Sequence, residues 1–75
     1  MFLKDVHIGG KVRITTMNRM NDLVQRRLLD LGIMEGSVVK MKRILPLGGP
    51  VAIETKGQLI GIRRCDAKRI QVESV

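Results

Sequence analysis

The sequence predicts a mainly β fold, a small barrel of five to six strands with one amphipathic α-helix after the first strand. The chain has 75 residues, which is room for a single domain spanning residues 1–75 with a thin core. Runs of alternating apolar and polar residues recur along it, joined by short connections that often contain glycine. Only one segment has the longer period of a helix. So short a chain with that many strands can bury their apolar faces only by curling into a small barrel.

The first strand is expected at residues 11–16, where β-branched Val12 and Ile14 alternate with charged residues and should face the core. A helix is expected next, at about residues 20–31, with Asn18 or Asn21 as its N-cap. Gly32 follows the last apolar residue, where a residue with left-handed backbone commonly ends a helix. Apolar side chains gather on one side of this helix at about 100° per residue: Met20, Leu23, Val24, Leu28 and Leu31.

Residues 33–37 predict a tight turn in which Gly36 takes positive φ. Four more strands are expected after it, with short connections, at residues 38–44, 51–56, 58–63 and 69–73. Gly57 follows Lys56 in a short hairpin turn between the second and third of these. The alternation slips within the strand at 38–44, which predicts a β-bulge there. The polar segment 64–69 is too short and too charged for a strand, and it predicts a single helical turn.

The connection at residues 45–50, Leu-Pro-Leu-Gly-Gly-Pro, is longer and more apolar than a simple hairpin turn requires. Its prolines should stiffen the two ends, and its glycines permit positive φ between them. In a domain too small to leave apolar surface unused, its second leucine either packs on the core or binds another protein. The first candidate binding site is therefore this loop, formed by Pro46, Leu47, Gly48, Gly49 and Pro50.

The net charge of +7 predicts attraction to an anionic partner, which could be nucleic acid, a lipid surface or an acidic protein face. Small basic barrels that bind single strands usually stack bases on exposed aromatic rings. Phe2 is the only aromatic residue here, so no specific nucleic-acid partner is expected. A nucleic-acid-binding or transcription-regulator module that uses the basic cluster from Arg63 to Arg69 is the alternative function.

Catalysis and metal binding are not expected, and no cofactor is predicted. One His, one Cys and seven scattered carboxylates offer no nucleophile, base and orienting group at a recognisable spacing. His7, Cys65 and Asp66 are not spaced as a zinc or iron ligand set either. The single cysteine cannot form an internal disulfide, and the sequence has neither a signal-peptide pattern nor an apolar run of roughly 20 residues. A cytoplasmic location is therefore expected.

Three elements of the segment from Arg27 to Glu73 form a pattern: the helix end Leu28-Leu29-Asp30-Leu31-Gly32-Ile33 with Gly36, the loop Pro46-Leu47-Gly48-Gly49-Pro50, and the ending at residues 59–63 with Ile70-Gln71-Val72-Glu73. This segment resembles the FeoA family, the small cytosolic component of bacterial ferrous iron transport systems. The family loop often has an acidic residue where this chain has Gly49, so a role that needs a carboxylate there is not expected.

The resemblance implies an SH3-like small barrel that works as a non-enzymatic accessory or regulator of ferrous iron transport. Its implied partner is FeoB, a large membrane protein that joins an iron-permeation domain to a cytosolic GTP-binding domain. The chain would then lie in the cytoplasm, at the inner face of the membrane through that partner. A related barrel is expected at the carboxyl end of iron-dependent repressors, where it acts as an interaction module.

Residues of two kinds, one leucine and two arginines, are candidates for the partner-binding surface besides the loop itself. Leu29 falls away from the apolar side of the predicted helix, and it packs either under the loop or against a partner. Arg63 and Arg64 are the basic candidates. Structural turn roles are assigned to Gly32, Gly36 and Gly57. Unpaired strand edges in so small a barrel also predict weak self-association.

Overall fold

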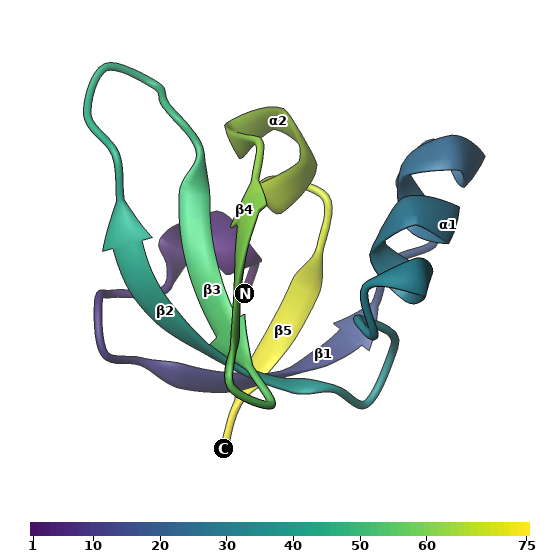
Figure 1. Cartoon of the computed structure of the whole chain (residues 1–75), viewed down its shortest axis with the longest axis horizontal. Coiled ribbons are helices and arrows are strands. Elements are labelled where there is room, and N and C mark those ends of the chain that lie inside the picture. Colours follow the sequence, from purple (N-terminus) through teal and green to yellow (C-terminus); the bar gives the residue numbers. More distant parts are fainter.

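One curled antiparallel sheet makes up most of the molecule. The computed structural model describes residues 1–75. Five strands are ordered β4-β3-β2-β1-β5 across the sheet (Figure 1). The predicted fold class, mainly β with one longer helix after the first strand, is confirmed, and the strand count is five. The strands are β1 (Lys11–Thr16), β2 (Val38–Ile44), β3 (Val51–Thr55), β4 (Gln58–Ile62) and β5 (Gln71–Ser74).

The strand boundaries differ from the predicted ones where a neighbouring turn takes over the backbone. Strand β3 ends before Lys56, which enters the turn with φ of 51°, and β4 ends before Arg63, which caps the short helix α2 (Arg64–Ala67). Strand β5 starts later than predicted, at Gln71. The pairing of β2 with β3 shifts register between Met41 and Arg43, which confirms the predicted bulge.

Helix α1 (Asp22–Asp30) stands beside the sheet and is joined to it mainly through its carboxyl-terminal end (Figure 1). The Asn21 side chain accepts a 2.8 Å hydrogen bond from the backbone N–H of Leu23, so Asn21 and not Asn18 is the N-cap. Gly32 has φ of +87°, as expected for the residue that ends a helix. The backbone N–H of Ile33 donates to the carbonyl of Leu28, and that of Gly32 to the carbonyl of Leu29. These two bonds form a complete Schellman motif.

The apolar side of α1 is narrower than the sequence predicts. Leu28 is buried, and Val24 packs partly against the core. Leu23 and Leu31, predicted to face the core, are instead 77% and 41% exposed. The prediction was wrong because it assumed that the sheet covers the whole apolar side of the helix, whereas the sheet meets only the stripe around Leu28.

The first residues of the chain form structure that the sequence analysis did not anticipate. A 3-10 turn, η1 (Leu3–Asp5), buries Leu3 completely. The backbone N–H of Val72 donates to the Met1 carbonyl at 2.8 Å, and that of Leu3 donates to the Ile70 carbonyl at 2.9 Å. The amino-terminal segment therefore pairs with β5 along the edge that β1 leaves free.

Buried side chains from all five strands fill the inside of the curled sheet in one continuous cluster. Edge strands β4 and β5 do not pair with each other, so the ladder is open at that point. Helix α2 connects the two strands there, and its Ala67 is fully buried. None of the helices has the length and apolar composition that a transmembrane span requires.

Candidate functional site

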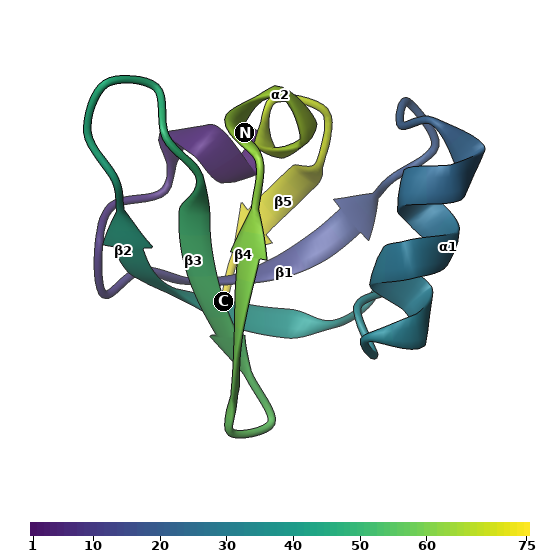
Figure 2. The same cartoon turned by 45° about the horizontal axis from the view of Figure 1, so that its top comes forward.

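The loop at residues 45–50 is a tight turn that projects from the end of the β2–β3 hairpin (Figure 2). The Gly49 N–H donates to the Pro46 carbonyl at 3.1 Å, and the Leu45 N–H donates to the Pro50 carbonyl at 3.2 Å. Leu47 and Gly48, the two central residues, have φ of 60° and 75°. Positive φ at both central positions is the mark of a type I′ turn. The turn predicted at residues 46–50 is present, but its first left-handed residue is Leu47 rather than a glycine.

Leu47 is the most exposed large apolar side chain of the protein, with a relative exposure of 103%. It does not pack back on the core. A side chain with a Cβ is also disfavoured at positive φ, at a cost of about 1 to 2 kcal/mol. An apolar side chain held fully in solvent by a strained backbone gains nothing for folding, and it is the kind of feature that is typical of a binding site.

Gly49 fixes the shape of the turn in a different way. A Cβ at this position would lie 3.0 Å from the Leu45 Cβ and 3.2 Å from the Pro46 carbonyl oxygen. Both contacts are shorter than ordinary van der Waals separation, so a residue with a Cβ at position 49 would require its neighbours in the loop to shift by a few tenths of an ångström.

Arg64 supports the base of the loop from α2. Its Nη2 donates to the Leu45 carbonyl at 3.4 Å, while its Nε is buried and has no hydrogen-bond partner. The side chain therefore lies against the start of the loop. Arg63 points elsewhere, because its Nε forms a 3.2 Å ion pair with Asp66, one helical turn away. Of the two predicted arginines, only Arg64 has a contact with the loop.

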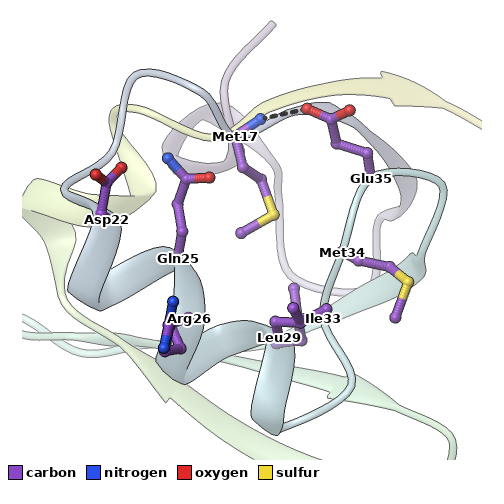
Figure 3. A pocket seen from close by; sticks show the side chains of 8 residues that line it. All are labelled: Met17, Asp22, Gln25, Arg26, Leu29, Ile33, Met34 and Glu35. Carbon is purple, nitrogen blue, oxygen red and sulfur yellow. Dashed lines mark hydrogen bonds between the residues drawn. The ribbon is translucent and has the colours of Figure 1, made fainter.

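Helix α1, which carries Leu29, lies on the opposite side of the molecule from the loop in both views of the fold (Figures 1 and 2). Leu29 is 52% exposed and faces an open groove of about 400 Å³ together with Met17, Ile33 and Met34 (Figure 3). Glu35 closes one end of this groove by accepting a 3.2 Å hydrogen bond from the backbone N–H of Met17. Leu29 therefore does not pack under the loop, and these two parts of the predicted site lie on separate surfaces.

The glycines assigned to turns adopt the backbone predicted for them. Gly36 and Gly57 have φ of +93° and +79°. Lys56 precedes Gly57 with positive φ as well, so the β3–β4 hairpin also closes through a type I′ pair.

Ionisable groups offer little chemistry at either surface. No group of three His, Cys, Asp or Glu side chains lies close enough together to hold a metal ion. In η1, a hydrogen bond from the Lys4 ammonium and a second from the Phe2 backbone N–H hold the pKa of the Asp5 carboxyl below its usual value. Asp5 lies on neither of the two surfaces.

Comparison with known proteins assigns the chain to a family. The family model described as the FeoA domain matches residues 1–74. The chain belongs to the FeoA family. The solution structure of FeoA from Chlorobium tepidum is 33% identical with a TM-score of 0.93, and the alignment covers 100% of this chain and 70% of that one. A FeoA-like protein from Clostridium acetobutylicum is 29% identical with a TM-score of 0.83, covering 100% and 86%.

The FeoA fold also matches part of a larger protein. IdeR from T. acidophilum is 19% identical with a TM-score of 0.88, and the alignment covers 100% of this chain but only 34% of IdeR. At this identity the likeness shows the fold alone. These neighbours confirm the predicted SH3-like fold, and the FeoA family associates the chain with iron transport.

Two features of the FeoA surface were missed in the sequence analysis. Met34, 46% exposed beside Leu29, was not singled out, although a large apolar residue inside the turn predicted at residues 33–37 is a signal that could have drawn attention to it. Arg27 and Arg69 were not chosen as site residues, yet they line one hollow with Arg63. The signal for Arg27 was its place among the apolar residues of the helix.

Proposed function

We propose that this FeoA-family chain is a non-enzymatic accessory of ferrous iron transport that acts by binding the cytosolic side of FeoB. The observation that carries the proposal is Leu47, which is fully exposed on a strained turn that both prolines and Arg64 hold in place. Burying one leucine side chain contributes about 1.5 to 3 kcal/mol. Because the turn is already formed, little additional ordering would be needed on binding.

The absence of catalytic geometry supports an accessory role. His7 and Cys65, the single histidine and cysteine, are both exposed, and neither side chain makes a hydrogen bond that would activate it. The positive charge supports a location in the cytoplasm at the inner face of the membrane, next to anionic lipid headgroups, reached through FeoB.

The test is the affinity of the chain for the purified cytosolic domain of FeoB from the same organism, measured by calorimetry with and without guanine nucleotide. Leu47→Asn should weaken binding by roughly ten- to a hundredfold, as expected for the loss of one buried leucine. Leu59→Asn is the matched control, because Leu59 is 58% exposed on β4 and pairs with Glu54, towards the end of β3 that is opposite the loop. This variant should bind as the unmodified chain does. Equal affinities for all three proteins would contradict docking through the loop, and no binding by any of them would contradict the FeoB partnership itself.

Nucleic-acid binding is a second candidate, supported by the charge distribution. Of the fourteen Lys and Arg side chains, only Lys4 and Arg63 form ion pairs. Lys11 and Lys40 even lie directly opposite each other on β1 and β2, where like charges repel. Affinity for single-stranded RNA or DNA that falls steeply with salt would support this candidate, and no retention at physiological salt would exclude it.

A further inference from the structure

A second groove runs along the flank of α1 that faces β4 and α2. It consists of two hollows of about 150 and 360 Å³. The two hollows adjoin, because Val24, Arg27, Arg63 and Asp66 line both of them. We call this the arginine groove. Neither the loop at residues 45–50 nor Leu29 lines it, so it is separate from both surfaces described above.

Three parts of the chain bring positive charge to the arginine groove. Arg27 lies on α1, Arg63 at the N-cap of α2, and Arg69 in the segment after α2. Asp66 is the only carboxylate among the lining residues, and it is already paired with Arg63 at 3.2 Å. Arg27 and Arg69 have no ion-pair partner. Guanidinium groups that share a hollow repel one another, and a bound carboxylate or phosphate would remove that cost.

The same groove also has an apolar component. Leu28 and Ile62 are buried and line its inner part. Two exposed leucines lie at its edge, Leu31 with 41% exposure and Leu23 with 77%. These exposed leucines are the ones that the helical pattern places on the apolar side of α1 and that the sheet leaves uncovered. A free inorganic anion would make no use of them.

The combination of free arginines with exposed leucines restricts the class of ligand that fits the arginine groove. Phe2, the only aromatic side chain, does not line the groove, so the groove offers no platform on which a nucleic-acid base could stack. We propose that the arginine groove binds a short acidic peptide segment of another protein, with a carboxylate between Arg27 and Arg69 and an apolar side chain against Leu23 and Leu31. The proposal does not depend on docking through Leu47.

The experiment is an NMR titration of the ¹⁵N-labelled chain with a capped peptide in which single leucines alternate with pairs of glutamates. Backbone amide shifts are expected at Arg27, Arg63 and Arg69. Arg27→Gln and Arg69→Gln should each lower the affinity by about three- to tenfold, the range for loss of one charged hydrogen bond in a partly exposed groove. Raising the salt concentration should also weaken binding of the peptide, because salt screens the attraction between its carboxylates and the arginines.

Arg13→Gln is the matched control, since it removes the same charge from an exposed position on β1 and should leave the affinity within about twofold of the unmodified chain. The melting temperature of each variant shows that the fold is retained. A peptide with glutamine in place of glutamate, and inorganic phosphate at the same concentration, should bind more weakly than the acidic peptide. The proposal would be overturned if the glutamine peptide or phosphate caused shifts equal to those of the acidic peptide, or if Arg13→Gln lost as much affinity as the groove variants. It would also be overturned if the shifts were confined to other surfaces or if none occurred.

Discussion

Leu47 and Lys56 are the two residues other than glycine that have positive φ, and each is the first central residue of a type I′ turn. Asparagine tolerates this backbone better than leucine or lysine because its short polar side chain can bond locally. The two turns thus place the same strain on two chemically different side chains. Lys56 extends a charged group into water, while Leu47 extends an apolar one.

Replacing either residue by asparagine should therefore stabilise the protein. Leu47→Asn and Lys56→Asn are each expected to raise the free energy of unfolding by about 0.5 to 1 kcal/mol, measured as a higher midpoint in urea at an unchanged slope. If Leu47→Asn lowers the stability instead, Leu47 contributes to packing, and its proposed role in docking loses its basis. Lys56→Asn controls for the backbone effect, because it should leave FeoB binding unchanged.

At the scale of elements, the end of α1 determines where the helix stands. The Schellman motif brings Ile33, which is fully buried, next to Leu28 at the end of the helix, and this anchor holds the remainder of α1 away from the sheet. Both grooves follow from that arrangement, since one lies on each flank of the helix. The sequence predicted the left-handed residue of this motif, because Gly32 follows the last apolar residue of the helix. It did not contain the angle at which α1 leaves the sheet, and Leu23 and Leu31 were misassigned for that reason.

Gly32 should be more sensitive to substitution than its open surroundings suggest. A Cβ at Gly32 would meet no atom within 4 Å, so any cost comes from its φ of +87° alone. Gly32→Ala is expected to lower the free energy of unfolding by about 1 to 2 kcal/mol. Gly61 provides the control, because a Cβ there also meets nothing and its φ is not positive. Gly61→Ala should be neutral or slightly stabilising. Thermal unfolding of both variants is the measurement, and equal effects of the two substitutions would contradict this account of the helix end.

At the scale of the whole molecule, the sequence analysis predicted most of the sheet and little of the first ten residues. Alternation and turn signals located every strand because each has one buried and one exposed face. Leu3 and Val6 were missed, since a short 3-10 turn has too few residues for a period to be visible. Burial of Leu3 depends on the far end of the chain, since η1 packs against α2 and the Leu3 N–H donates to the Ile70 carbonyl. Likewise the loop was recognised as a turn, but the exposure of Leu47 could be known only once the sheet was in place.

The two edges of the sheet differ, which sharpens the prediction of weak self-association. The amino-terminal segment pairs with β5, while β4 pairs only with β3. Any self-association through strand pairing is therefore expected at Gln58–Ile62.

The amino-terminal segment should also be essential for stability, because it fills the core and covers a sheet edge at the same time. Leu3 is fully buried, and its N–H donates to the Ile70 carbonyl at 2.9 Å. Leu3→Ala is expected to lower the free energy of unfolding by about 2 to 5 kcal/mol, a large part of the total for a domain of this size. Hydrogen exchange should report faster exchange of the Val72 amide, whose partner is the Met1 carbonyl, while the amides of β3 keep more of their protection. Leu59→Ala, at an exposed position, should change stability by less than about 0.5 kcal/mol. Similar effects of the two substitutions would show that the first residues do not form part of the core.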